Sequence, residues 1–410
     1  MNIKNVEEYF PGMDIIDSDI KEEIDTIYEK VKNFKVTNDD IKSSLDKDNL
    51  SYQDFYNILN DKDGIFLEAM GEKARQQRMR YFGNNVTLFS PIYIANYCEN
   101  SCKYCGFRAQ SDIKRAKLTF DEIEAEMAAL AATGIEDVLI LTGESEKFSS
   151  IDYIAKSCEI AKKYFKVIGV EIYPANVADY EKLRKAGADF VTVFQESYNK
   201  KTYDFYHPAG HKRSFNYRID TQERAMMGGM RGVGFGTLFG LGDPIEEAFK
   251  LGIHASLVQK KYPEAEIAIS LPRIRPAKGA DDSLIFKNIV EDREFFQIML
   301  AIRIFLPYAS ITLSTRESRD FRNLAVKYAA TKVSASVDTS IGHRSKNNQH
   351  SGGSQFEIDD MRTTKDVVDD LNSIGMTAVF TDYINVWKNS PIFKIREYLF
   401  ANYLFFLYRL

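Results

Sequence analysis

The feature that most constrains the fold is a regular alternation of short apolar runs with amphipathic stretches. The eight apolar runs of strand length are Val86–Ala95, Asp137–Leu141, Val167–Ile172, Phe190–Phe194, Gly232–Leu238, Glu266–Ser270, Ser310–Leu313 and Lys332–Ser336. The helical patterns between them include Thr119–Thr133, Ala175–Lys185, Asp220–Met230, Ile245–Lys260, Asp292–Leu306 and Glu317–Tyr328. This alternation predicts a parallel sheet with right-handed crossovers. Eight repeats predict the α/β class and a closed (β/α)8 TIM-type barrel, with its active site at the carboxyl ends of the strands.

The chain continues beyond this alternation at both ends. The helical patterns that precede it are Ile15–Phe34, Thr37–Leu45, Ser51–Leu59 and Gly64–Arg80. We therefore expect an N-terminal helical cap over residues 1–82, the barrel over residues 83–340, and a C-terminal loop and helical extension over residues 341–410. The tail from Tyr383 to Leu410 is dense in aromatic residues, which is compatible with a docking helix or an interfacial amphipathic helix.

Charge and composition exclude several classes of protein. The net charge is −5 and the isoelectric point is about 5.8, which argues against a nucleic-acid partner. No uncharged apolar run reaches the length of a transmembrane segment, and the acidic N-terminus lacks the apolar region of a secretory signal. The chain has only four cysteines, and three of them lie close together. This usage favours a reducing cytoplasm.

The clustered cysteines are Cys98, Cys102 and Cys105, separated by three residues and then by two. Thiolates are soft ligands suited to Fe–S clusters, and three of them would leave one iron of a [4Fe–4S] cube free to bind another molecule. A structural zinc site usually has four protein ligands, but no second CxxC pair is present and the nearest downstream histidine, His207, is far away in sequence. A disulfide framework does not suit an odd cluster in a long chain. Cys158 lies in a helical pattern and is expected to be buried packing.

The string Cys98-x3-Cys102-x-Tyr104-Cys105 resembles the signature of the radical SAM enzymes. In that superfamily S-adenosylmethionine (SAM) chelates the free iron, and one-electron reduction releases a 5′-deoxyadenosyl radical. Tyr93, five residues before Cys98, and the Gly-Phe pair after Cys105 resemble the branch of aromatic amino acid lyases. The resemblance implies a [4Fe–4S] cluster with Cys98, Cys102 and Cys105 as its ligands, and SAM as the second cofactor.

The same resemblance assigns residues near the strand ends to SAM. Thr142-Gly143-Glu144 is similar to the family's GGE motif, which receives the methionine amino group, although Thr142 replaces the first glycine. The residues that the resemblance implies for cofactor binding are Tyr104, Thr142, Gly143, Glu144, Glu171, Glu196 and Arg218. Arg218 would hold the SAM carboxylate, and Arg224 is the alternative. The glycines of Gly232–Gly242 would let the backbone approach the adenosyl group.

The residues expected to bind the substrate come from the last two predicted strands and the first. Arg316, after the seventh strand, matches the residue that in these lyases anchors the substrate carboxylate, and a guanidinium suits that task because it binds carboxylates bidentately. A salt bridge from Arg316 to Glu317 or Asp320 is the structural alternative. Ser334 and Ser336 would assist Arg316, and Tyr93 would lie near the substrate amine.

The resemblance implies cleavage of the Cα–Cβ bond of L-tyrosine to 2-iminoacetate (dehydroglycine) and p-cresol for thiamin thiazole synthesis. A flavodoxin- or ferredoxin-type reductant and a thiazole synthase are the implied partners. A related tyrosine lyase, the hydrogenase maturase that makes carbon monoxide and cyanide, carries a C-terminal domain with three more cysteines, and none follows Cys158 here. A tryptophan lyase of the same branch is another alternative. An Fe–S electron carrier or a zinc-stabilised scaffold is the alternative from a different class.

Overall fold

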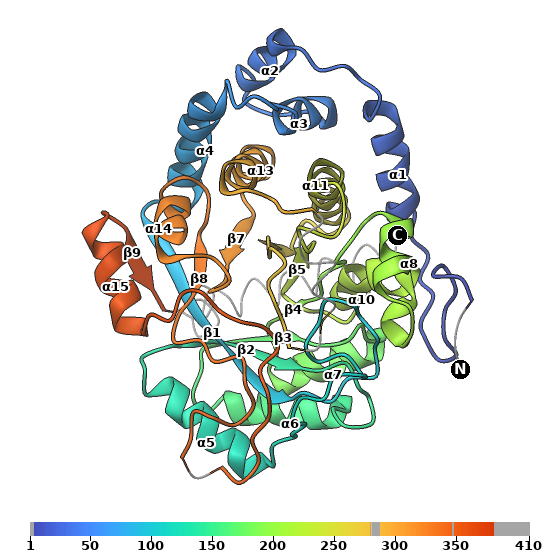
Figure 1. Ribbon diagram of the computed structural model, residues 1–410, viewed down its shortest axis with the longest axis vertical. Helices are drawn as coiled ribbons and strands as arrows, with labels where there is room; N and C mark the ends of the chain where they lie inside the picture. Colours follow the sequence, from blue (N-terminus) through green and yellow to red (C-terminus); the bar gives the residue numbers. More distant parts are fainter. Residues whose placement is uncertain (1–3, 279, 281–287, 347, 381–410) are drawn as a thin grey trace, which may run out of the picture.

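The computed structural model describes residues 4–278, 280, 288–346 and 348–380. Its dominant feature is a ring of parallel strands (Figure 1). The strands are β1 (Asn85–Ala95), β2 (Asp137–Thr142), β3 (Val167–Glu171), β4 (Phe190–Thr192), β5 (Gly232–Gly236), β6 (Glu266–Ser270), β7 (Ser310–Leu313), β8 (Lys332–Ser334) and β9 (Thr377–Val379). The eight strands predicted from the sequence are all present, and their ends differ from the prediction by at most two residues.

The ring closes through β1, which pairs in parallel with both β2 and β8. Ser90 lies opposite Val138 of β2, and Thr87 lies opposite Lys332 of β8. The remaining strands pair in chain order from β2 to β8, so the predicted (β/α)8 barrel is confirmed. All strands point the same way, and the segments that follow their carboxyl ends therefore gather at one mouth of the barrel.

The helices form an outer layer around the barrel. They are α1 (Ile20–Val31), α2 (Asn38–Leu45), α3 (Tyr52–Leu59), α4 (Leu67–Phe82), α5 (Phe120–Ala131), α6 (Ile151–Ala161), α7 (Val177–Ala186), α8 (Lys200–Tyr206), α9 (Phe215–Ile219), α10 (Thr221–Met227), α11 (Pro244–Lys261), α13 (Asp292–Phe305), α14 (Arg319–Tyr328) and α15 (Thr364–Ser373). Local sequence determines where several of them begin. Thr119 and Glu122 form a capping box at the start of α5, and Asp243 caps α11 just before Pro244.

The N-terminal helices lie on the flank of the barrel and not over its mouth. Figure 1 shows α1 to α4 arranged outside α11 and α13. Aromatic rings make this contact: Phe55 of α3 stacks on Phe305 of α13 at 4.2 Å and on Phe249 of α11 at 5.6 Å. These rings are large apolar surfaces, so their burial holds the helices to the barrel wall. Cys158 is buried in α6, as expected.

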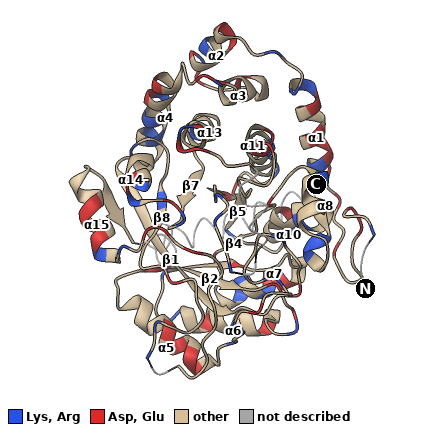
Figure 2. Cartoon of the chain, in the orientation of Figure 1, with Lys and Arg blue, Asp and Glu red and all other residues tan. Residues whose placement is uncertain are grey.

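The chain after β8 forms a long connection, then α15 and β9, which sequence patterns did not separate. β9 pairs in parallel with the first residues of β1, Asn85–Thr87. The aromatic tail from Tyr383 to Leu410 lies outside the described residues. No helix in the described part of the chain is long and apolar enough to cross a membrane. Acidic and basic side chains are interspersed on the outer helices, for example on α1 and α4 (Figure 2).

The glycines of β5 make room for side chains of the neighbouring segment. A Cβ on Gly234 would lie 2.3 Å from Thr192 Oγ1, and a Cβ on Gly236 would lie 2.4 Å from a ring atom of Phe194. These glycines therefore allow Thr192 and Phe194 to point into the barrel. The expected approach of the adenosyl group to the backbone of Gly232–Gly242 stays a prediction.

Candidate active site

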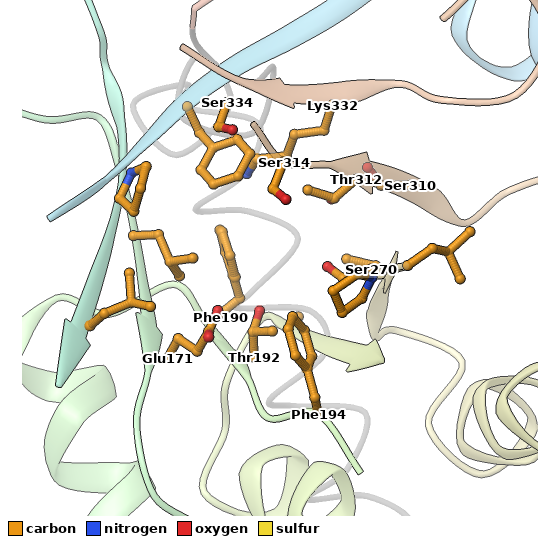
Figure 3. A pocket seen from close by; sticks show the side chains of 18 of the residues that line it. Glu171, Phe190, Thr192, Phe194, Ser270, Ser310, Thr312, Ser314, Lys332 and Ser334 are labelled. Carbon is orange, nitrogen blue, oxygen red and sulfur yellow. The ribbon is translucent and has the colours of Figure 1, made fainter. Parts of the chain in front are cut away.

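A cavity of about 1050 Å³ occupies the barrel interior. Side chains from β3, β4, β6, β7 and β8 point into it (Figure 3). Of the predicted site residues, those that line it are Tyr93, Tyr104, Cys105, Glu171, Glu196, Arg316 and Ser334. The cavity is therefore where the predicted cofactor and substrate residues meet.

The cysteine loop follows β1 and is fastened on several sides. The backbone N–H of Ser101 donates to Ala209 O at 3.0 Å, and that of Lys103 donates to Tyr206 O at 3.1 Å. Gly143, after β2, lies so close that a Cβ there would be 2.3 Å from Tyr97 O. The glycine of the Thr142-Gly143-Glu144 motif thus lets the cysteine loop pack directly on the end of β2.

The three cysteines of this loop are free thiols, and Cys102 is buried. Burial raises the pKa of Cys98 to about 12 and raises the pKa of Cys102 and Cys105, while the Lys212 ammonium lowers the pKa of Cys102 and Cys105. Among the described residues no three His, Cys, Asp or Glu side chains converge on a single metal ion. A cluster does not require the sulfurs to converge on one ion, because each cysteine binds a separate iron. The nearby ammonium would offset the negative charge of the thiolates.

Four buried charges form a network beside the cysteine loop. Arg218 Nη1 lies 3.1 Å from Glu144 Oε1, and Lys212 Nζ lies 2.7 Å from Glu196 Oε1 and 3.5 Å from Glu144 Oε1. Burial would raise the pKa of Glu144, but Arg218 and Lys212 hold it below its ordinary value. Asn100 of the cysteine loop donates to Glu144 Oε2 at 2.8 Å. The network therefore brings two carboxylates and two cations to the edge of the cysteine loop.

Glu196 has an unusual backbone conformation in this network. Its φ is +68°, in the left-handed region that non-glycine residues rarely adopt. Thr237 Oγ1 and the Leu238 backbone N–H both donate to Glu196 O, at 2.7 and 2.9 Å. These bonds from the end of β5 hold the turn that directs the Glu196 side chain toward Lys212.

Tyr104 is held by a histidine that sequence patterns did not single out. His207 Nδ1 lies 2.8 Å from the carbonyl oxygen of Tyr203, so Nδ1 carries the proton. His207 Nε2 therefore accepts the hydrogen bond from Tyr104 Oη, at 2.9 Å. Burial lowers the pKa of His207 well below its ordinary value, which keeps the ring neutral.

Glu171 points into the cavity without a hydrogen-bond partner among the described residues. Burial, and next the nearby Glu196 carboxylate, raise its pKa to about 7. Two buried hydroxyls near the predicted site, Thr142 Oγ1 and Ser334 Oγ, likewise have no hydrogen-bond partner in the described chain. Unpaired buried polar groups are costly, so these three side chains have unused capacity to bind a ligand.

Arg316 lies in the cavity without a carboxylate at salt-bridge distance among the described residues. The alternative prediction, a salt bridge from Arg316 to Glu317 or Asp320, is not formed, and Glu317 pairs with Arg273 instead. The Arg316 guanidinium lies 3.4 Å from the ring centroid of Phe356, and Nη1 donates to Arg273 O at 3.4 Å. Burial lowers the pKa of Arg316. A stacked, half-buried guanidinium without a counter-charge is suited to bind an anionic group.

Ser336 and Arg224 do not line the cavity and are bonded to the surrounding structure. Ser336 Oγ accepts from the backbone N–H of Thr364 at 2.8 Å and bonds to Thr364 Oγ1 at 2.9 Å, so it holds the start of α15. This placement counts against the predicted role of Ser336 beside the substrate. Arg224, the alternative to Arg218, donates to the carbonyl oxygen of Ala175 at 2.9 Å and stacks on Tyr217. Its bonds are structural.

Sequence patterns missed Lys212, His207 and Asn100 as site residues. They placed Gln355 in a string that resembles the family but gave it no role; in the structure it accepts a hydrogen bond from Tyr93 Oη at 2.9 Å. Asn100 lies within the cysteine string, and its position between two ligands was the one available signal. Lys212 and His207 lie in loops far from the motifs they contact, and no local pattern marks such residues.

Comparison with known proteins defines the class. Residues 92–251 match the family model of the radical SAM superfamily, and residues 270–377 match that of the biotin and thiamin synthesis associated domain. Over 345 residues the chain is 31% identical to 2-iminoacetate synthase of Escherichia coli (strain K12). The aligned residues make up 84% of this chain and 90% of that relative. The chain belongs to the radical SAM superfamily, in the branch of aromatic amino acid lyases that includes 2-iminoacetate synthase.

The chain is also similar to a solved structure and to a second relative. The crystal structure of HydG, a maturase of the [FeFe]-hydrogenase, aligns with a TM-score of 0.83 at 29% identity, over 92% of this chain and 84% of that one. The chain is 28% identical over 229 residues to 3-methylornithine synthase of Methanosarcina barkeri (strain Fusaro / DSM 804), covering 55% of this chain and 60% of that relative.

Membership of this family confirms the expected cofactors, a [4Fe–4S] cluster and SAM, with Cys98, Cys102 and Cys105 present for the cluster. The chain is therefore a carbon–carbon lyase. An Fe–S electron carrier and a zinc-stabilised scaffold are set aside.

Proposed function

We propose that this enzyme cleaves the Cα–Cβ bond of L-tyrosine to 2-iminoacetate and p-cresol. The observation that carries the proposal is Arg316, a half-buried guanidinium that faces the cavity with no carboxylate partner in the described chain. The unpaired Glu171 carboxylate and the Tyr93 hydroxyl lie in the same cavity. An amino acid carries one carboxylate and one ammonium group, which complement these charges. The identity to 2-iminoacetate synthase supports the same substrate class.

The proposed roles divide the site in two. Cys98, Cys102 and Cys105 would hold the cluster, and the network of Glu144, Glu196 and Arg218 would receive the amino and carboxylate groups of SAM beside Thr142, Gly143 and Tyr104. Arg316 and Ser334 would hold the substrate carboxylate, and Tyr93 and Glu171 would face its amine. The bound cofactors supply a 5′-deoxyadenosyl radical, and the protein positions the substrate amino hydrogen next to it and excludes water.

The products determine how many electrons and protons the reaction requires. SAM yields 5′-deoxyadenosine and methionine, and the overall balance requires two electrons and one proton from outside. A flavodoxin- or ferredoxin-type protein is the proposed reductant. 2-Iminoacetate hydrolyses in water, so we place the enzyme beside a thiazole synthase that consumes it for thiamin, in a reducing cytoplasm. The match to the biotin and thiamin synthesis associated domain supports this role.

A maturase-like tyrosine lyase is the second candidate, favoured by the TM-score of 0.83 to HydG. It shares the tyrosine cleavage and differs in the later products. No cysteine follows Cys158 in this sequence, so these residues offer no thiolates for a second cluster. A tryptophan lyase is the third candidate.

The experiment that tests the substrate site is Arg316→Lys. Lysine keeps the charge but cannot bind a carboxylate bidentately. We expect the wild type to release about one p-cresol per 5′-deoxyadenosine, and the variant to cleave SAM with roughly a tenfold lower yield of p-cresol per 5′-deoxyadenosine. Arg319→Lys is the matched control, because Arg319 is exposed and pairs with Asp370 outside the cavity. An unchanged product ratio in Arg316→Lys would contradict the proposed anchor.

A further inference from the structure

The connection between β8 and α15, described for residues 336–346 and 348–362, is called the strap here, and its residues Val337, Thr339, Gln355 and Phe356 line the cavity. Ile341 and Gly352 pair as an antiparallel bridge within it. Glu126 of α5 accepts from the backbone N–H groups of Arg344 and Ser345, at 3.2 and 2.6 Å. At its other end the backbone N–H of Asp359 donates to Thr315 O at 2.8 Å. The strap is therefore fixed on both sides of the mouth.

Gln355 is the residue where the strap meets the cysteine loop. A Cβ on Gly106 would lie 2.5 Å from Gln355 O, so the backbone of the strap packs directly against the residue after Cys105. The Gln355 side chain lines the cavity, with Nε2 3.9 Å from Cys105 Sγ and Oε1 2.9 Å from Tyr93 Oη. Phe356, the next residue, stacks on Arg316. Two adjacent strap residues thus contact a cluster cysteine, the proposed amine site and the proposed carboxylate anchor.

The chemistry of these partners orients the amide of Gln355. A cluster-bound sulfur is a thiolate, which accepts hydrogen bonds and repels a carbonyl oxygen. The NH2 group therefore faces Cys105, and the oxygen accepts from the Tyr93 hydroxyl.

We propose that Gln355 raises the reduction potential of the cluster by donating an N–H···S hydrogen bond to Cys105, and holds Tyr93 through the same amide. Reduction adds negative charge to the cluster and its sulfurs, so a donor at a ligand sulfur stabilises the reduced form more than the oxidised form. Gln355 is thus a positioning residue that acts through Cys105 and Tyr93. This inference rests on the proposed ligation by Cys105.

The test is the midpoint potential of the reconstituted full-length enzyme, measured by anaerobic redox titration with the EPR signal of the reduced cluster as the readout. Gln355→Leu removes both hydrogen bonds, and Gln355→Met keeps the length of the side chain without a donor. We expect both variants to hold as much iron and sulfide as the wild type. Their reduction equilibrium constant should fall about tenfold, which is about 59 mV for a one-electron couple.

Gln349→Leu is the matched control, because it makes the same change at an exposed position of the same strap. Its potential should equal that of the wild type. A wild-type potential in cluster-loaded Gln355→Met would overturn the proposal. Loss of the cluster from Gln355→Met would also overturn it, since Gln355 would then serve assembly and not tuning. Failure of Cys105 as a ligand is separable, because Cys105→Ser would then retain a full [4Fe–4S] cluster.

Discussion

Lys212 shows how one residue outside every motif holds the charged part of the site. Its ammonium contacts both Glu144 and Glu196. Burial and the neighbouring Arg218 would lower the pKa of Lys212, but the two carboxylates raise it above its ordinary value, so the side chain remains charged. A lysine this deeply buried is stable only with such partners, and the partners depend on it in return.

Lys212→Met should therefore destabilise the enzyme strongly. It leaves Glu196 buried without its nearest cation, and breaking such a pair costs about 3–5 kcal/mol. We expect a melting temperature several degrees lower in calorimetry and a reduced yield of cluster. Lys163→Met is the control, because its pair with Glu124 is exposed to solvent, which screens the interaction. Equal melting temperatures for the two variants would refute the role given to Lys212.

Glu171 gives the site a pH dependence. Its pKa of about 7 in the folded protein lies above the ordinary value, so the folded state binds its proton more tightly than the unfolded state. The stability that this proton binding adds is fully present below the unfolded pKa and is lost as pH rises through 7. Because Glu171 faces the cavity, we expect the stability lost over this range to be on the order of 1–3 kcal/mol.

Glu171→Gln should thus raise the melting temperature of the SAM-free enzyme at pH 8 and leave it unchanged near pH 5. The measurement is a thermal melt across this pH range. Glu159→Gln, on the exposed surface of α6, is the control and should show no such trend. A variant that is less stable than the wild type at pH 8 would show that the Glu171 carboxylate is paired.

Sequence alone identified the residues whose chemistry is carried by a local string. The three cysteines, Gly143 and Arg316 fall in such strings, and the structure places each at a strand end. Glu144, Glu196 and Arg218 were predicted as cofactor residues, but the sequence did not show that they pair with one another through Lys212. These four residues come from separate segments, and their charges meet only after the barrel has closed. The predicted role of Ser336 stays a prediction, since its hydroxyl bonds to Thr364 at the start of α15.

At the scale of elements, strand periodicity was the strongest signal in the chain. Each strand of a parallel barrel is buried on both faces, so it reads as a continuous apolar run. The ends of β4, β5 and β8 were less well predicted, because the regular strand pairing stops before their last predicted residues. Glu196, at φ +68°, and Ser336, at φ +50°, mark backbone turns just after β4 and β8. The strap was predicted as a polar loop only, since its order comes from contacts with α5 and the cysteine loop.

Gly143→Ala tests the close contact between β2 and the cysteine loop. The added Cβ would lie 2.3 Å from Tyr97 O, and backbone atoms there cannot move without shifting Cys98. We expect a loss of roughly 1–3 kcal/mol of stability and little or no cluster, measured by calorimetry and iron content. Gly71→Ala in α4 is the control, because its Cβ meets only Tyr328 ring atoms at 3.6 Å. A normal iron content in Gly143→Ala would contradict this contact.

At the scale of the whole molecule, the barrel leaves its interior open. The cavity reaches from Tyr104 and Cys105 at the mouth to Pro263 and Tyr308 beyond the opposite strand ends. The N-terminal helices cover the flank (Figure 1). The cysteine loop and the strap both contribute residues to the lining of the cavity, for example Cys105 and Gln355. The cofactor residues and Arg316 therefore face one shared chamber, and the account's central claim is that tyrosine is cleaved there.

The most direct test of that claim is anaerobic turnover in D2O with SAM, a reductant and either tyrosine or tryptophan, followed by mass spectrometry of the products. The hydrogen abstracted from the tyrosine amino group exchanges with solvent, so 5′-deoxyadenosine should carry one deuterium. p-Cresol and glyoxylate, from hydrolysis of 2-iminoacetate, should form in equal amounts, without carbon monoxide. Turnover of tryptophan with tyrosine inert, or release of carbon monoxide, would contradict the account.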